Sequence, residues 1–213
     1  MTASNLFREH LGKSPLVAIL RGVKPDEVVG IGEALAEASI SIIEVPMNSP
    51  EPLRSIEALA KRFGDGLLVG AGTVLTVAQV GEVARAGGRI IVSPSTDYDV
   101  IAASAAEGLV SAPGYFTPSE AFLALKAGAT ALKLFPAEAA TPGVLRAHRA
   151  VLPKDVPVLI VGGVTPAVVG TWFDAGADGF GLGSALYKPG QSAAQVGQQA
   201  RDFAAAVKDA QRG

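Results

Sequence analysis

The sequence contains no cysteine and only two histidines, and these absences exclude several kinds of chemistry. Without cysteine there can be no disulfide, no thiolate metal site and no cysteine nucleophile. His10 lies in the leader and His148 in the helical pattern LRAHRA, so neither is expected near a functional site. Metal binding through imidazole is therefore disfavoured, and we predict no metal centre.

Charge is also scarce in this chain. Charged residues make up 18% of the 213 residues, against roughly 25% in an average domain, and the formal net charge is -2. Both signs are mixed along the chain, so no basic stripe is available for nucleic acid or an anionic membrane. The apolar runs are far shorter than the roughly 18 residues that span a bilayer, and the start MTASNLFREHLG lacks a targeting core. We expect a cytoplasmic protein with no nucleic-acid or membrane partner.

One pattern recurs along the whole chain: a helix-like stretch closes on a small residue, and a short apolar run follows. Eight such runs are centred near residues 18, 43, 69, 91, 110, 132, 159 and 180. Their spacing of roughly 20 to 28 residues fits a strand plus a crossover helix, and the lack of alternation fits strands covered on both faces. The pattern predicts a single α/β domain over residues 1–213, a (β/α)8 TIM barrel with a short N-terminal helix at 3–11. An open doubly wound sheet is the alternative.

Helices are predicted between these strands where proline or a capping residue opens an amphipathic stretch. Pro25 and Pro50 are expected in the first turns of two of them, and Thr117–Pro118 opens a third. Asp97 is expected to cap a helix. The predicted ranges are 25–37, 50–63, 117–127 and 191–208.

Two charged residues interrupt apolar runs at strand ends, where the chemistry of a barrel resides. Lys133 stands within ALKLFP, where burial lowers the pKa of an amine below its usual value and makes it a nucleophile for ketones. Glu44, the only carboxylate in SIIEVP, can act as a general base. The structural alternatives are a lysine that extends its ammonium to the barrel end and a glutamate that serves as its counter-ion.

The other strand ends carry residues suited to an anionic ligand. Arg21 has a planar guanidinium that fits a carboxylate or phosphate, and the Thr73 hydroxyl can orient a substrate. The glycines of VGGVTP and GLGS allow a close approach of backbone amides to phosphate, although such pairs are also common in plain turns. Tyr115 and Phe135 follow strands and are candidates for the pocket wall. The candidate binding residues are Arg21, Thr73, Pro94, Phe135, Val161, Gly162, Gly163, Gly183 and Ser184.

Together these motifs resemble one family along nearly the whole chain, the pyruvate-type class I aldolases that cleave 2-keto-3-deoxy-6-phospho sugar acids. The resemblance is carried by AILRG (18–22), IEVPMNSP (43–50), GAGTV (70–74), ALKLFP (131–136), VGGVTP (161–166) and GLGS (181–184). It implies a Schiff-base lysine at Lys133, a proton-transfer glutamate at Glu44, and pyruvate contacts at Arg21 and Thr73. It also implies a pocket wall at Phe135 and a phosphate cradle formed by the glycines and Ser184. The implied protein is a homotrimer that needs no metal or organic cofactor.

The family has a gluconate and a galactonate branch, which differ at C4 of the substrate. The gluconate branch reads Glu-Val-Thr-Leu-Arg-Thr and Thr-Gly-Gly where this chain has residues 44–49, EVPMNS, and residues 161–163, VGG. The chain therefore resembles the galactonate branch, and activity on the gluconate epimer or on both remains an alternative. Two functions of other classes also remain open: a sugar-phosphate epimerase or decarboxylase, and a non-catalytic phosphate-binding barrel.

Overall fold

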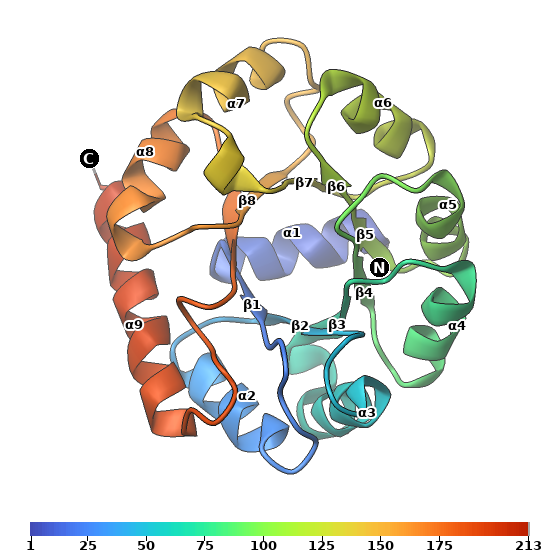
Figure 1. The fold of residues 1–213 in the computed structure, drawn as a ribbon, viewed down its shortest axis with the longest axis vertical. Coiled ribbons are helices and arrows are strands. Elements are labelled where there is room, and N and C mark those ends of the chain that lie inside the picture. The colour runs from blue at the N-terminus through green and yellow to red at the C-terminus, as the bar shows by residue number, and fades with distance from the viewer. Residues whose placement is uncertain (213) are drawn as a thin grey trace.

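The computed structural model describes residues 1–212; Gly213, the last residue of the predicted domain, lies outside the described residues. Within that range, nine parallel strands form one sheet that closes into a barrel with helices around it (Figure 1). The strands are β1 (Leu16–Ile19), β2 (Ile42–Pro46), β3 (Leu68–Gly72), β4 (Ile90–Val92), β5 (Val110–Ala112), β6 (Gly114–Tyr115), β7 (Leu132–Leu134), β8 (Val158–Val161) and β9 (Gly179–Leu182).

The fifth barrel position is shared by β5 and β6, which Pro113 separates. β5 pairs with β4, and β6 pairs with β7. Two further hydrogen bonds cross these junctions, from Gly114 N to Ser93 O (2.9 Å) and from Lys133 N to Pro113 O (2.9 Å). Because the segment bonds to both neighbours, the ring is closed. The predicted barrel is confirmed, and the open doubly wound sheet is wrong.

Helices follow the strands and form the outer layer. They are α2 (Val28–Glu37), α3 (Pro52–Phe63), α4 (Val77–Arg85), α5 (Tyr98–Ala106), α6 (Pro118–Lys126), α7 (Pro142–Arg149), α8 (Val169–Asp174) and α9 (Ala193–Ala210), with single 3-10 turns at Gly64–Gly66, Ala137–Ala139 and Pro166–Val168. Asp97 caps α5, as predicted, by accepting a hydrogen bond from Val100 N. Among residues 1–212, none of these helices combines the length and apolarity needed to cross a membrane.

The helices α2, α3 and α9 begin two or three residues later than the predicted starts at 25, 50 and 191, and the first two differences have a local cause. Pro25 lies in a turn before α2, where the amides of Glu27 and Val28 both donate to Lys24 O. The next helix begins at Pro52 and not at Pro50, because Glu51 adopts a left-handed conformation with φ of 41°. A residue that precedes proline is disfavoured in the right-handed helical region, so the helix cannot begin before Pro52.

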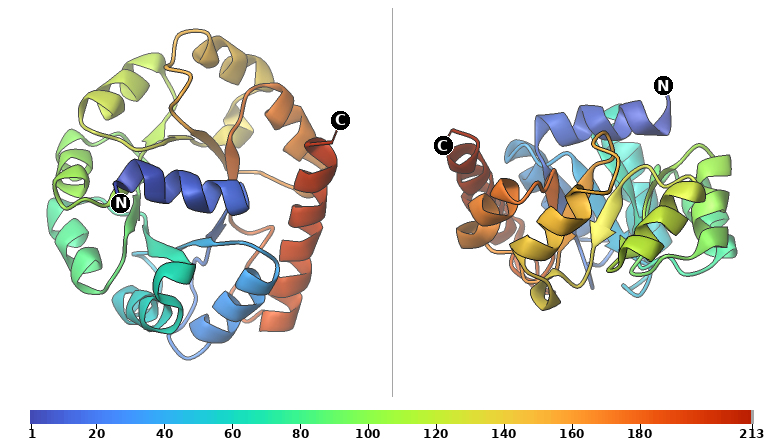
Figure 2. Two further views of the ribbon diagram at one scale, coloured as in Figure 1. Left: turned by 180° about the vertical axis from the view of Figure 1, so that it is seen from behind. Right: turned by 90° about the horizontal axis from the view of Figure 1, so that it is seen from above.

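The N-terminal helix α1 (Ala3–Lys13) crosses one end of the barrel (Figure 2). Its Phe7 is fully buried in a cluster that includes Val17, Ile42, Leu68 and Leu159, all on the amino-terminal halves of strands. The predicted extra helix therefore closes the amino-terminal end of the barrel. The opposite end, where the strands finish, remains open for function.

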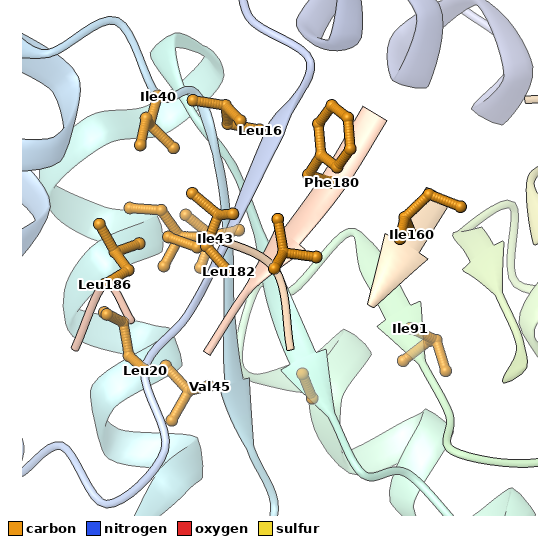
Figure 3. Packing of buried hydrophobic residues seen from close by; sticks show 14 of the residues in the cluster. Leu16, Leu20, Ile40, Ile43, Val45, Ile91, Ile160, Phe180, Leu182 and Leu186 are labelled. Carbon is orange, nitrogen blue, oxygen red and sulfur yellow. The ribbon is translucent and has the colours of Figure 1, made fainter. Parts of the chain in front are cut away.

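Strand residues alternate between two apolar layers. One set fills the barrel interior with Phe7, and the neighbouring residues pack outward against the helices. The outer layer includes Ile43, Ile160, Phe180 and Leu182 (Figure 3). Because both faces of each strand are buried, the runs are continuously apolar. A charged side chain within such a run therefore occupies an exceptional position.

Candidate active site

A cavity of about 520 Å³ opens at the carboxyl ends of the strands. It lies at the end of the barrel opposite α1. Of the residues that the sequence singled out as catalytic or binding candidates, all except Tyr115 line it: Arg21, Glu44, Thr73, Pro94, Lys133, Phe135, Val161, Gly162, Gly163, Gly183 and Ser184. Side chains that are up to 163 residues apart in the sequence therefore share one pocket.

Lys133 is the central residue of β7 and faces the interior of the barrel. Its neighbours Leu132 and Leu134 belong to the outer layer, so the alternation of the strand turns Lys133 inward. Its side chain lines the cavity and its Nζ lies 4.5 Å from the centre of the Phe135 ring. Burial lowers the pKa of this amine, the positive charge of Arg21 lowers it further, and Glu44 opposes both effects. The site therefore favours a neutral amine, which is the nucleophilic form.

Glu44 lies at the centre of β2, in register with Ile19 on β1 and Gly70 on β3. Only 2% of its surface is exposed, and within the described chain its Oε2 has no hydrogen-bond partner. Burial raises the pKa of Glu44 to about 7, although Lys133 and Arg21 act in the opposite direction. A carboxyl group with this pKa can both accept and release a proton near neutral pH.

The carboxylate of Glu44 fits against β3 because residue 72 is glycine. A Cβ atom on Gly72 would lie 1.6 Å from Glu44 Oε2 and 2.2 Å from its Cδ. Side-chain atoms cannot approach that closely, so any larger residue would displace the carboxylate. The GAG sequence of β3 is thus needed for the position of Glu44.

Arg21 reaches the cavity from the loop after β1 and is held by two side chains. Its Nη1 donates to Asn48 Oδ1 at 2.6 Å, and its Nη2 makes a longer contact of 3.4 Å with Thr73 Oγ1. Thr73 has a φ of 54°, a left-handed conformation that is unfavourable for a β-branched residue. Asn48 was not predicted as a site residue, although it lies in the motif IEVPMNSP. This side of the cavity presents a fixed guanidinium and a hydroxyl to an anion.

The loops after β8 and β9 form the opposite wall. Gly162 and Gly163 have φ values of 108° and 66°, which L residues with side chains rarely adopt. After β9, the amides of Leu186 and Tyr187 both donate to Gly183 O, so the chain makes a helical turn that begins next to Ser184. These loops present backbone and one hydroxyl to the cavity, as a phosphate cradle requires.

Sequence reasoning missed several residues that line the cavity. Glu138 packs against the glycine loop, since a Cβ on Gly162 would lie 2.6 Å from its Oε2. Lys188 also lines the cavity, from the turn after β9. Both are exposed and stand outside the apolar runs, so no anomaly in the pattern marked them. Their nearness to the motifs ALKLFP and GLGS was the only available signal.

The expectation that Tyr115 lines the pocket is wrong. Gly114 occupies the inward position of β6, because it pairs with Lys133. Tyr115, the next residue, therefore points outward, where its ring lies 5.6 Å from that of His148. Neither histidine lines the cavity. Within residues 1–212, no group of three or more histidine, cysteine, aspartate or glutamate side chains is arranged to hold a metal ion.

Comparison with known proteins identifies relatives of this barrel. The 2-dehydro-3-deoxy-6-phosphogalactonate aldolase of Escherichia coli (strain K12) is 46% identical over 93% of this chain and 97% of its own length. The probable 2-dehydro-3-deoxy-6-phosphogalactonate aldolase of Rhizobium meliloti (strain 1021) is 50% identical over 87% of this chain and 88% of its own. A solved structure described as native KDPGal superposes with a TM-score of 0.93, at 46% identity, over 94% of this chain and 98% of that one. Residues 7–199 match the family described as KDPG and KHG aldolase, and the chain therefore belongs to that family of aldolases.

Proposed function

We propose that this protein cleaves 2-dehydro-3-deoxy-6-phosphogalactonate to pyruvate and D-glyceraldehyde 3-phosphate through a Schiff base on Lys133. The observation that carries the proposal is the pair formed by Lys133 and Glu44, an amine and a carboxyl group that are both nearly inaccessible to solvent and face one cavity. The names of the two relatives support the choice of substrate.

The reaction begins when the neutral Nζ of Lys133 attacks the C2 ketone. Loss of water from the resulting carbinolamine gives a protonated imine, which is an electron sink. Glu44, directly or through a water molecule, removes the proton of the C4 hydroxyl. The C3–C4 bond then breaks, its electron pair forms an enamine, and the aldehyde leaves. Glu44 returns its proton to C3, and hydrolysis of the imine releases pyruvate. Because the imine accepts the electrons, this chemistry needs no metal or organic cofactor.

The two walls of the cavity suit the two ends of the substrate. Arg21 and Thr73 are proposed to hold the carboxylate next to the reacting ketone. The glycine loops and Ser184 are proposed to hold the phosphate, with Pro94, Phe135 and Val161 forming apolar wall. Binding energy from both ends then aligns the C3–C4 bond between Lys133 and Glu44.

We attribute a preference for the galactonate epimer to two positions that differ between the branches. Val161 lines the cavity without a hydroxyl where the gluconate branch has threonine, and Asn48 holds Arg21 from a segment that differs between the branches. A buried hydroxyl without a hydrogen-bond partner is costly, so these residues change which epimer finds a partner for its C4 hydroxyl. A lactate dehydrogenase-coupled assay with both epimers tests this. A larger kcat/KM for the gluconate epimer would contradict the assignment.

Borohydride reduction in the presence of pyruvate tests the mechanism directly. The expected result is a three-carbon adduct on Lys133 and none in Lys133→Met, with turnover abolished in that variant. Lys126→Met, which changes an exposed lysine of α6 outside the cavity, is the matched control and should react normally. Turnover that survives Lys133→Met would indicate an epimerase or decarboxylase, and sugar-phosphate binding without turnover would indicate a binding module.

We also propose that the chain acts as a single cytoplasmic domain that assembles into a homotrimer. The helix α5 contacts both α4 and α6. Large apolar side chains are exposed on and near these three helices: Leu75, Val77, Tyr98, Phe116, Phe122 and Leu123. A patch of this kind is typical of an interface between proteins. Light scattering should give three times the mass of the chain, and Phe122→Lys should reduce it. A monomer for the unmodified protein would refute this.

A further inference from the structure

The proposed phosphate wall of the cavity has an unusual balance of charge. Within residues 1–212, the charged side chains that line the cavity are Arg21, Glu44, Lys133, Glu138 and Lys188. Three of these already have a place in the proposed reaction: Arg21 is bonded to Asn48 and Thr73, and Glu44 and Lys133 project from the centres of their strands. Of the other two, Glu138 packs against the glycines after β8, and Lys188 follows the turn after β9.

Glu138 is unfavourably placed for an anion on this wall. The carboxylate contacts both loop glycines, since a Cβ on Gly163 would lie 3.1 Å from Glu138 Oε2 and one on Gly162 still closer, at 2.6 Å. A phosphate monoester carries ≈ −1.5 to −2 charges at pH 7, so it would be repelled by this carboxylate. Neutral amides and the Ser184 hydroxyl supply hydrogen bonds but no compensating positive charge. A cation at this wall would offset the repulsion by Glu138.

Lys188 is held where it can supply that charge. The residue before it, Tyr187, is buried, and its hydroxyl donates to Glu27 Oε1 at 2.9 Å. The backbone amide of Lys188 donates to Gln191 Oε1 at 2.7 Å. Tyr187 N also donates to Gly183 O, which places Lys188 directly after the turn that contains Ser184. The backbone is thus fixed on the cavity wall, while the side chain itself is exposed and free to reach a ligand.

We propose that Lys188 is a phosphate-binding residue that selects phosphorylated over unphosphorylated substrates. This inference rests on the proposed function and assigns to one side chain the positive charge that the glycine loops lack. The ammonium of Lys188 donates a charge-assisted hydrogen bond to a phosphate oxygen and offsets the repulsion by Glu138. It takes no part in bond breaking, so its effect is confined to substrates that carry a phosphate.

Kinetics of Lys188→Met and Lys188→Arg with two substrates test this role. With 2-dehydro-3-deoxy-6-phosphogalactonate, Lys188→Met should lower kcat/KM by ten- to one-hundredfold, or about 1.4 to 2.8 kcal/mol, mainly through KM. With the unphosphorylated sugar acid, kcat/KM should change less than about twofold, because the lost contact is not used. Lys188→Arg should retain most of the activity. Competitive inhibition by inorganic phosphate should weaken in Lys188→Met.

Lys126→Met is again the matched control, because it removes one exposed positive charge outside the cavity. An equal loss with both substrates, or no loss with the phosphorylated one, would overturn the assignment. Pyruvate carries no phosphate, so borohydride trapping at Lys133 should be unchanged in Lys188→Met. If the unmodified protein fails to trap pyruvate, the proposed aldolase function fails, and this result is distinct from a failure of Lys188 alone.

Discussion

Gly72→Ala would test whether the position of Glu44, and not merely its presence, controls the reaction. The added methyl would lie 1.6 Å from Glu44 Oε2 and 2.5 Å from Oε1. The carboxylate would have to withdraw by roughly 2 Å to restore an ordinary van der Waals separation. Misplacement of a reacting group by about 1 Å can cost 10²-fold in rate. We therefore expect kcat to fall about one-hundredfold, although every catalytic side chain is retained.

The assay is steady-state cleavage coupled to lactate dehydrogenase, with circular dichroism to show that the barrel is folded. Gly30→Ala in α2 is the matched control, since a Cβ there meets nothing within 4 Å. It should leave kcat unchanged and stabilise the protein by up to about 1 kcal/mol. Pyruvate trapping should persist in Gly72→Ala, because Lys133 is untouched. A folded Gly72→Ala variant with kcat within about threefold of the unmodified protein would refute the reasoning.

Three further changes probe the same cavity. Burial raises the pKa of Glu44 to about 7, so the stability that its protonated form contributes to the fold is lost as pH rises from 4.5 through 7. Glu44→Gln should therefore raise the free energy of unfolding, measured by urea denaturation, by up to about 3 kcal/mol at pH 8 and by much less at pH 5. The same pKa should appear as an acid limb near pH 7 in kcat/KM, and an unchanged rate down to pH 5 would contradict it. Val161→Thr should shift the ratio of specificity constants toward the gluconate epimer by tenfold or more, as measured with both substrates. Thr73→Gly should stabilise the fold by up to about 1 kcal/mol by removing an unfavourable φ, yet lower kcat/KM because Arg21 loses a contact; an unstable variant would argue against strain.

Much of the barrel could be predicted because each strand is a short apolar run buried on both faces. The spacing of these runs shows which segments are buried, so it located the strands but not the details at their ends. Pro50 illustrates the limit: it is a good first-turn residue, but the proline two positions later determines where the helix begins. The split of the fifth strand at Pro113 could not be predicted from the sequence either, because the barrel closes through hydrogen bonds between distant segments.

The site was predictable in proportion to the cost of burying each residue. Lys133 and Glu44 stood out because a charge inside an apolar strand is expensive and requires a reason. Tyr115 was misjudged because strand alternation, which sends it outward, depends on a register that only the paired structure fixes. Lys188 lies in an exposed turn, where a charged side chain keeps its hydration. No apolar run surrounds it, so its charge does not stand out in the sequence as those of Lys133 and Glu44 do. Its role emerges only when the charges around the assembled cavity are counted, since the wall that should bind a phosphate otherwise holds a carboxylate.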